Sequence, residues 1–550
     1  MESILIRIPT KISARSISVL ALPFDGNVAV DALLPKHNPF GALIRGMKDR
    51  QSLGDVPAEE FRKQLHELAD WIADYREHIS EQRIAPNDRP GAILAQLDRT
   101  APEAGASLHD IFADIERVIV PGVAHWAHPQ FMSYFGCTTT SPGILAEMIT
   151  GALNVNAMTW RTSPAATELE TLVLDWLRQW LGLPTEFAGV VYDTASISTM
   201  HALAAAREQA APNTRQLGLS GRGLPAFRIY ASDQAHSSVE KGAIAIGIGE
   251  DNVQRVPTDA EFRMNVSALR EMVASDIRSN FKPLAVVATV GTTSTASVDP
   301  IVEIAQVCRE HKMWLHIDGA YGAGLALLPE CDWVTAGWNE ADSIVVNPHK
   351  MLFVPFDFSA LYVRDLGRLR RLFTLAPEHL HLRDPVGAEI NYMDYGVQLG
   401  RRFRALKAWV VWRAFGREGL AARIREHLRL AKLFADWVRE DKRFELSAPV
   451  VMGVVCFRFT GAGKIDTVAG DVDAGPREAT AATTDTIDML NSKIVEHINA
   501  SGRAYLTQTK LRGRTVMRIG LGNILTTERH LRNVWKMIRE AAESRARSPR

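Results

Sequence analysis

Apolar residues follow two different spacings along the chain, and the change between them suggests how it is organised. Between residues 56 and 125 the apolar positions recur at helical intervals, beginning with Phe61, Leu65, Leu68 and Ile72. This first segment is therefore predicted to be helical.

The helical pattern is clearest from Ser163 to Pro184. Ser163 is a suitable N-cap, Pro164 suits the first helical turn, and Gly182 and Pro184 mark the end. Between them lies one apolar stripe: Leu169, Leu172, Val173, Trp176, Leu177, Trp180 and Leu181. A stripe of this kind is typical of core packing, so we assign it no chemistry.

From about residue 188 to 365 the spacing changes. Short apolar runs rich in β-branched residues alternate with helical stretches: Gly189–Tyr192, Phe227–Ala231, Leu284–Val290, Met313–Ile317, Ser343–Val346 and Leu361–Arg364. Continuously apolar strands separated by helices predict a parallel α/β sheet covered on both faces. After Leu406 the pattern indicates helices with a few strands, which suits a smaller C-terminal domain.

Composition narrows the classes of protein that the chain can belong to. Its 550 residues contain 46% hydrophobic residues, with 63 basic and 63 acidic side chains, so the formal net charge is +0. This balance gives no reason to expect a nucleic-acid or membrane partner, and it permits self-association. The 4 cysteines are scattered, which favours a reducing compartment and no disulfide framework. No apolar run is long enough to span a bilayer.

Two segments carry a different composition. In the first 25 residues, Arg7, Lys11 and Arg15 precede a short apolar stretch, which is compatible with a secretory or transit segment. We favour an unstructured extension, or an upstream start codon with Met47 as the true beginning. The small and polar residues 461–486 are predicted to form a surface loop.

Polar residues follow five of the predicted strands. The clusters are Asp193–Ser196, Ser232–His236, Gly291–Ser294, His316–Ala320 and Asn347–Lys350. In open α/β sheets, ligands bind beyond the carboxyl ends of the strands. The five clusters would therefore converge on one crevice if their strands are adjacent.

The side chains of these clusters suit one cofactor. They include one lysine, three aspartates, three histidines and several small hydroxyls, without a nucleophile elbow, a metal-ligand cluster or a GxGxxG loop. Pyridoxal phosphate needs an amine partner, a carboxylate partner for its pyridinium nitrogen, a stacking ring and a phosphate cradle. The crevice contains a candidate for each.

These residues also carry a resemblance. The segments DQAHSS (233–238), HIDGAYG (316–322) and NPHK (347–350) resemble the pyridoxal-dependent decarboxylases of the aromatic amino-acid decarboxylase group, as do SPAATELE (163–170), GTTSTASVD (291–299) and LGRRFRALK (399–407). The similarity runs in order from about residue 56 to 545. It is specific for the family and weakly specific for the substrate.

The resemblance implies the α/β fold of the fold-type-I pyridoxal-phosphate enzymes, with a large, mostly parallel sheet of seven-stranded type and a small C-terminal α+β domain. We expect four parts: residues 1–55 as a poorly ordered extension, 56–140 as a dimer-forming helical segment, 141–405 as the cofactor-binding domain, and 406–550 as the small domain.

The resemblance also assigns roles to residues of the crevice. Lys350 is expected to hold the cofactor as a Schiff base, and Asp318 to pair with the pyridine nitrogen. His236 is expected to stack on the ring and to help orient the substrate carboxylate. Thr293 is expected to bond near the ring hydroxyl, and Ala320 to lie under the ring. For comparison, a lone lysine is usually a solvated surface charge, and a lone histidine is more often a packed or surface residue.

Four further residues resemble the family's phosphate-binding positions. They are Ala195, acting through its backbone N–H, together with Ser196, Asn347 and His349. Asp193 stands where many relatives have a glycine or another small residue. A carboxylate there would repel a phosphate unless it points away.

The expected substrate pocket departs from the family pattern. His379 stands where relatives place a catalytic tyrosine, donated by the partner subunit, that protonates the carbanion left after CO2 loss. A phenylalanine there is associated with aldehyde-forming relatives, whereas a histidine, with an ordinary pKa of about 6.5, can transfer protons. A solvated loop histidine is the simpler interpretation.

The pocket is expected to include Trp126, Cys137, Asn156 and Met158. Asn156 and Met158 stand where aromatic-specific relatives have apolar residues that contact the substrate ring, and Cys137 where a threonine is frequent. These departures weaken the case for an aromatic substrate. For Arg401, Arg402 and Arg404 we favour a structural role at the junction with the small domain.

The implied activity is α-decarboxylation of an L-amino acid to the amine and CO2 in a cytoplasmic homodimer with shared active sites. Two alternatives remain open. One is a decarboxylation-dependent aldehyde synthase that uses the same site and dioxygen. The other is a protein that binds pyridoxal phosphate without turnover.

Overall fold

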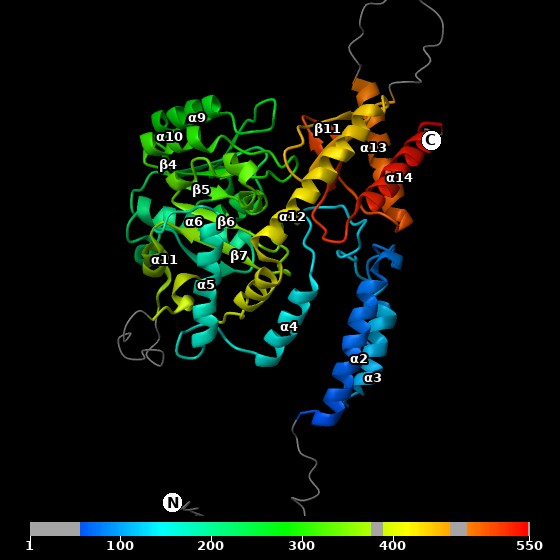
Figure 1. Ribbon diagram of the computed structural model, residues 1–550. Helices are drawn as coiled ribbons and strands as arrows, with labels where there is room; N and C mark the ends of the chain where they lie inside the picture. The colour runs from blue at the N-terminus through cyan, green and yellow to red at the C-terminus, as the bar shows by residue number, and fades with distance from the viewer. Residues whose placement is uncertain (1–54, 376–388, 462–480, 548–550) are drawn as a thin grey trace, which may run out of the picture. The chain divides into compact units, whose positions relative to one another are not determined.

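The computed structural model describes residues 55–375, 389–461 and 481–547 (Figure 1). The chain divides into two compact units, residues 1–70 and 71–550. The described part of the first unit is the start of helix α2 (Ala58–Glu77), where Glu59 and Glu60 occupy the first turn. Acidic side chains at this position stabilise a helix by interacting with its dipole.

The second unit contains a seven-stranded sheet in the order β1-β7-β6-β5-β4-β2-β3. Its strands are β1 (Ala188–Tyr192), β2 (Phe227–Ser232), β3 (Val253–Val256), β4 (Lys282–Thr289), β5 (Trp314–Asp318), β6 (Ser343–Val346) and β7 (Ser359–Val363). Only β7 runs antiparallel to its neighbours within this sheet. The predicted α/β fold with a mostly parallel sheet is therefore confirmed.

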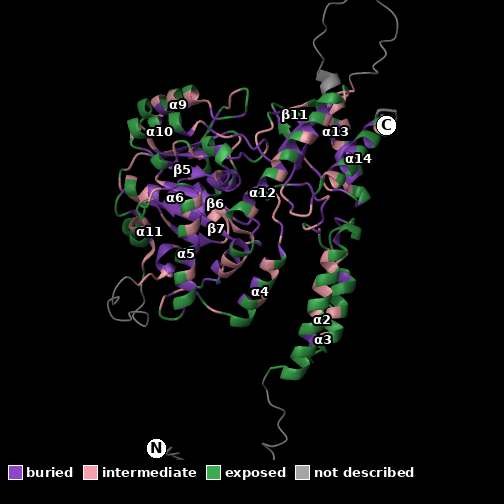
Figure 2. Cartoon of the chain, viewed as in Figure 1, coloured by how far each residue is buried: buried purple, intermediate pink, exposed green. Residues whose placement is uncertain are grey.

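Helices cover both faces of this sheet. Helix α6 packs on one face, and α9 and α10 pack on the other (Figure 1). The central strands are buried throughout their length (Figure 2), which explains why they read as continuously apolar. The helices in this part of the chain are α4 (Ser141–Leu153), α5 (Pro164–Trp180), α6 (Ala195–Ala210), α7 (Thr214–Leu217), α8 (Ser238–Ala245), α9 (Val266–Arg278), α10 (Ile301–His311) and α11 (Leu366–Phe373).

A second, antiparallel sheet lies in the C-terminal part, in the order β10-β11-β9-β8. Its strands are β8 (Phe444–Leu446), β9 (Val454–Phe459), β10 (Thr507–Leu511) and β11 (Arg514–Gly520), accompanied by helices α12 (Ala405–Glu440), α13 (Ala481–Ser501) and α14 (Glu528–Arg547). Within α12, Gly416 has a φ of 63°, a conformation that glycine adopts at little cost and that interrupts the helix there.

The predicted helix boundaries were partly correct. Helix α5 begins at Pro164 as expected, and the chain leaves the helix at Gly182, whose φ is +65°. The expected capping by Ser163 is wrong, because its hydroxyl is buried and accepts no hydrogen bond from the helix.

The predicted helix over 56–125 is only partly present. Helix α3 (Leu108–Asp114) continues into a π-helical turn at Ile115–Ile119, while Pro86, Pro90 and Pro102 lie in irregular chain between the helices. Short 3-10 turns complete the structure: Ile79–Glu81, Leu94–Gln96, Glu250–Asn252, Gly322–Leu327, Pro329–Thr335, Trp338–Glu340 and Tyr392–Tyr395.

Two cores of buried apolar residues underlie the two sheets. The residue boundaries expected for the four parts of the chain remain a prediction. Among the helices that the structure describes, none has the length and apolar character needed to cross a membrane.

A buried ion pair protects the outer edge of the large sheet. Strand β1 is an edge strand, so the polar backbone groups on its outer side have no neighbouring strand. The N–H of Val191 donates to Glu170 Oε1 at 3.0 Å, and its carbonyl accepts from Arg401 Nη2 at 2.8 Å. Arg401 and Glu170 also bond each other through two contacts of 2.6 and 3.1 Å, and their side chains are 5% and 3% exposed.

Breaking this pair should destabilise the protein strongly. In Glu170→Gln, the buried guanidinium of Arg401 loses its countercharge, so we expect the free energy of unfolding to fall by about 3–5 kcal/mol. As a matched control, Glu330→Gln removes a carboxylate from Arg425 in a pair that is about half exposed, and should cost about 0–1 kcal/mol. Urea denaturation measures both. Equal losses in the two variants would contradict a special role for the buried pair.

Several of the histidines in the described chain are buried. In four of them, His128, His201, His316 and His427, burial lowers the pKa from about 6.5 to about 4. A base whose pKa is lower in the folded state opposes folding once it must take up a proton. These residues therefore cost no stability above pH 6.5, and stability is lost as the pH falls from 6.5 toward 4. Burial raises the pKa of Asp299 to about 7. This one carboxyl group therefore makes the folded state more stable as the pH falls, which is opposite to the effect of the four histidines.

We therefore expect the free energy of unfolding, measured by urea denaturation, to fall steadily between pH 6.5 and 4, by about 1.4 kcal/mol per pH unit for each of these histidines. In His427→Gln, an amide can still donate to the carbonyl of Asn523, as the His427 ring does at 3.1 Å. This variant should show a shallower dependence on pH, whatever its stability at pH 7.5. An unchanged slope would exclude His427 as a contributor.

Candidate active site

The carboxyl ends of five strands meet at one edge of the large sheet. Because β7 is antiparallel to both of its neighbours, β1 runs in the same direction as β6, β5, β4 and β2. A cavity of about 440 Å3 lies at this edge. Eleven of the predicted site residues line it: Trp126, Cys137, Ala195, Ser196, His236, Thr293, Asp318, Ala320, Asn347, His349 and Lys350.

Lys350 enters the cavity from the turn after β6, where its N–H donates to the carbonyl of Asn347 at 2.9 Å. Burial lowers the pKa of its amine, an effect that the negative charge of Asp318 partly offsets. Its Nζ lies 4.9 Å from the centroid of the Phe135 ring. A lysine with a lowered pKa is more often unprotonated, which is the form that attacks carbonyl carbon.

Asp318 is the last residue of β5, and its carboxylate is 7% exposed. Its Oδ1 accepts the N–H of Ala320 at 3.0 Å, which fixes the orientation of the carboxylate. No lysine or arginine of the described residues forms an ion pair with it. A buried carboxylate of this kind is suited to pairing with a cation supplied by a ligand.

His236 lies in the turn after β2 and is open to the cavity. Its Nδ1 accepts the N–H of Ser238 at 3.1 Å, so the proton of the neutral ring lies on Nε2. Burial lowers the pKa of this imidazole, while the charge of Asp318 opposes the shift. The ring is therefore mainly neutral near pH 7.

A further group of lining residues is suited to an anion. Ala195 and Ser196 form the first turn of α6, whose N-terminal N–H groups carry partial positive charge. Asn347 is buried, and its Oδ1 has no hydrogen-bond partner among the described residues. His349 Nδ1 accepts the N–H of Phe358 at 2.9 Å, which leaves Nε2–H as a donor, and burial lowers the pKa of this ring to about 3.

Aromatic side chains form much of the cavity wall. Trp126 stacks on Tyr134 with ring centroids 5.4 Å apart, and Phe135 stacks on Tyr321 at 3.8 Å. Phe356 also lines the cavity and is exposed. Two residues after the end of β4, Gly291 has a φ of +94°, and a Cβ at this position would lie 3.0 Å from the backbone N of Gly322.

The C-terminal sheet contributes residues that the sequence analysis missed. Arg518 on β11 donates from Nε to the carbonyl of Ser294 at 3.0 Å and from Nη1 to the carbonyl of Tyr134 at 2.8 Å. Burial lowers the pKa of its guanidinium. The signal available in the sequence was a single arginine within the otherwise apolar run from Val516 to Leu521.

Two predicted residues, Asn156 and Met158, do not line this cavity in the described chain. Asn156 Oδ1 accepts the N–H of Arg401 at 2.9 Å, and the carbonyl of Met158 accepts the N–H of Met393 at 3.1 Å. The expected pocket role of Asn156 and Met158 is therefore not met within one chain. His379 lies outside the described residues.

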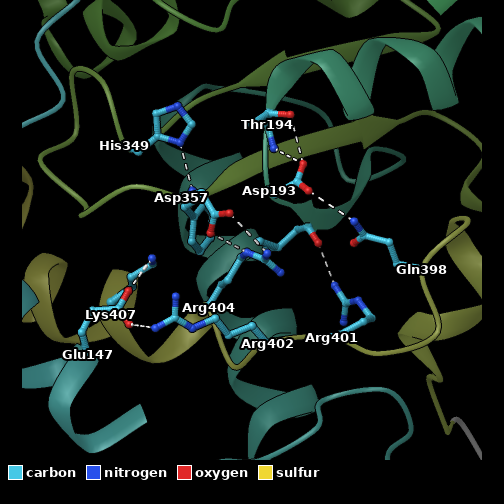
Figure 3. A network of polar contacts seen from close by, with 12 residues as sticks. Glu147, Asp193, Thr194, His349, Asp357, Gln398, Arg401, Arg402, Arg404 and Lys407 are labelled. Atoms are coloured by element: carbon cyan, nitrogen blue, oxygen red, sulfur yellow. Dashed lines mark hydrogen bonds and ion pairs between the residues drawn. The ribbon is translucent and has the colours of Figure 1, made fainter. Parts of the chain in front are cut away.

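The arginines of the 399–407 segment take part in a network of polar contacts (Figure 3). Arg404 Nε donates to Asp357 Oδ1 at 2.8 Å, next to the residue that bonds His349. Glu147 bonds both Arg402 and the buried Lys407. The predicted structural role of this segment agrees with these contacts.

The arrangement fits pyridoxal phosphate. The cavity combines a buried amine, a buried carboxylate without a protein cation and an anion-binding helix end. These are the groups that the cofactor's aldehyde, pyridinium nitrogen and phosphate need.

Comparison with known proteins gives the same assignment. Residues 90–460 match the pyridoxal-dependent decarboxylase conserved domain. The chain is 37% identical over 501 residues to the aromatic-L-amino-acid decarboxylase of Bos taurus, covering 88% of this chain and 96% of the relative.

Two solved structures are similar over nearly their whole length. One is Oryza sativa TDC with PLP and tryptamine, with a TM-score of 0.82 and 34% identity, covering 90% of this chain and 99% of that one. The other is Rhodiola rosea 4-hydroxyphenylacetaldehyde synthase, with a TM-score of 0.79 and 32% identity, covering 89% and 99%.

Proposed function

The chain belongs to the pyridoxal-dependent decarboxylase family, and from this membership and the cavity walls we propose that its substrate is an aromatic L-amino acid. It is a pyridoxal-phosphate enzyme that decarboxylates an amino acid. The observation that carries the proposal is the aromatic lining formed by Trp126, Tyr134, Phe135 and Phe356. Aromatic pairs contribute attraction beyond the burial of apolar area.

The roles of the site residues follow from their surroundings. When bound, pyridoxal phosphate supplies an aldehyde that condenses with an amine and a ring that accepts electrons. Lys350 would hold the cofactor through its amine, which burial favours in the neutral, nucleophilic form by lowering its pKa. Asp318, oriented by the N–H of Ala320, would pair with the pyridine nitrogen, and the free Nε2–H of His349 would donate to the phosphate.

Two further groups act on the substrate. The neutral ring of His236 lines the cavity, where it orients the carboxylate of the substrate. Arg518 adds a buried positive charge to the wall, which attracts that same carboxylate before it leaves as CO2. Cys137 shares this part of the cavity with Lys350, and burial raises the pKa of its thiol, so it acts as a small apolar contact.

An aldehyde synthase remains the second candidate, because one of the similar solved structures is a 4-hydroxyphenylacetaldehyde synthase. The expected proton donor, His379, belongs to a segment outside the described residues. The two activities differ in their products. A decarboxylase releases the amine and CO2, whereas the synthase releases the aldehyde, CO2, ammonia and hydrogen peroxide.

We also propose that two copies of the chain form a homodimer with shared sites. On α4, the side chains of Leu145, Ile149 and Leu153 recur every four residues and are exposed in the single chain. An apolar stripe of this kind is suited to burial against a second copy. Asn156 and Met158 follow α4 directly, so this interface would bring them to the partner's cavity.

A reducing cytoplasmic location agrees with four free cysteines.

The substrate proposal can be tested with a panel of L-tryptophan, L-tyrosine, L-phenylalanine, L-leucine and L-glutamate. We expect kcat/KM for CO2 release to be at least about tenfold higher for an aromatic member, given the contribution of aromatic pairs. Lys350→Ala should lose both the visible absorption band of the bound cofactor and all turnover. Preference for L-glutamate would contradict the aromatic assignment, and hydrogen peroxide among the products would favour the synthase.

The dimer proposal predicts that Leu145→Glu shifts the protein toward monomers, because a carboxylate in an apolar interface is costly to desolvate. Sedimentation velocity measures this shift, and activity should fall in parallel if the sites are shared. Leu217→Glu on α7, an equally exposed leucine away from α4, serves as the control and should leave the assembly unchanged. Identical sedimentation of both variants would exclude α4 from the interface.

A further inference from the structure

Asp193 does not itself line the cavity, but it directly precedes three lining residues, Thr194, Ala195 and Ser196. It directly precedes Thr194, the N-cap residue of α6, and its side chain turns toward its own neighbours (Figure 3). Asp193 Oδ1 accepts the N–H of Thr194 at 2.5 Å and its hydroxyl at 3.0 Å. Asp193 Oδ2 accepts from Gln398 Nε2 at 3.2 Å.

These contacts engage both hydrogen-bond donors of Thr194, the residue that precedes the proposed phosphate-binding residues Ala195 and Ser196. Thr194 lines the cavity, but both its N–H and its O–H are engaged by Asp193. The hydroxyl therefore presents lone pairs and not a proton to a ligand. Of the two residues that follow, Ala195 keeps its backbone N–H and Ser196 keeps its hydroxyl for an anion.

The charge of Asp193 also remains largely uncompensated. Among the described residues, its partners are the neutral Thr194 and Gln398, and no lysine or arginine forms an ion pair with it. The positive end of the α6 dipole stabilises this carboxylate when no ligand is present. A phosphate bound at this helix end would be repelled by the fixed negative charge of Asp193, which directly precedes the N-cap residue Thr194.

We propose that Asp193 is a specificity determinant of the cofactor site that weakens binding of the phosphate group while leaving the aldehyde end unaffected. The inference rests on the proposed placement of the phosphate at Ala195, Ser196, Asn347 and His349. The charge of Asp193 stabilises the cofactor-free protein relative to the cofactor-bound protein. The enzyme therefore exchanges its cofactor more readily than the same site would with a neutral residue at this position.

The test compares two ligands with the same aldehyde. Pyridoxal 5'-phosphate and pyridoxal are titrated into cofactor-free protein, and Kd is measured from the visible absorbance. In Asp193→Asn the side chain keeps its shape and can still accept from Thr194, but its charge is removed. We expect the Kd of the phosphate ester to fall about tenfold, with the Kd of pyridoxal unchanged. Inorganic phosphate should also compete more effectively in this variant.

Two controls separate the possible outcomes. Asp233→Asn neutralises an exposed carboxylate in the turn after β2, at the same edge of the sheet, and should change neither Kd. Ser196→Ala tests the phosphate placement itself and should weaken only the phosphate ester. If Ser196→Ala has no effect, the placement fails. If it weakens binding while Asp193→Asn changes nothing, the role of Asp193 alone is overturned.

A structural effect of the substitution is also distinguishable. Equal changes in the Kd of both ligands would show that Asp193 shapes the whole cavity, which contradicts the inference. Asp193→Ser provides a second neutral variant with an oxygen that can accept from Thr194, and it should reproduce the selective gain. The loaded Asp193→Asn protein should also show a larger rise in Tm on cofactor addition than the unmodified protein.

Discussion

The buried pair of Arg401 and Glu170 is the interaction on which the site depends. It bonds both polar backbone groups of Val191, on the outer edge of the large sheet, without another strand. Thr194 to Ser196, which follow shortly after Val191, line the cavity. The proposed phosphate-binding residues Ala195 and Ser196 are thus positioned in part by two charged side chains that do not line the cavity. Removing one of them would leave the other as an uncompensated buried charge.

The rest of the site follows from strand direction and from the control of charge. Parallel strands bring polar residues from distant parts of the sequence to one edge of the sheet. Burial then shifts the pKa values of these residues and so determines their protonation states. Lys350 is pushed toward its neutral form, and the imidazoles of His236 and His349 stay mainly neutral, while Asp318 provides the negative charge that a protonated ring nitrogen needs. The same fold could serve other substrates, because the wall that selects them comes from separate segments, including residues 126–137 and β10.

Sequence patterns predicted the parts of this structure that depend on local chemistry. The strands were recognisable because they are buried on both faces, and the residues at their carboxyl ends were found because open α/β sheets place ligands there. Arg518 and Tyr134 were missed because they reach the cavity through contacts made by distant segments. The capping role of Ser163 was wrong because tertiary packing buries its hydroxyl. Asn156 and Met158 could not be placed by reasoning about a single chain.

The aromatic wall has a consequence for the order in which the enzyme is completed during synthesis. The segment around Met132 is held by the C-terminal sheet: Met132 bonds Tyr505 and Gly520, and Tyr134 accepts from Arg518, 384 residues later. A nascent chain that already contains Lys350 and Asp318 therefore still lacks the support for one side of its cavity. Contacts across so large a sequence separation form late in folding. The ribosome must release nearly the whole polypeptide before a substrate-selective site exists, so premature termination should yield chains unable to discriminate among amino acids.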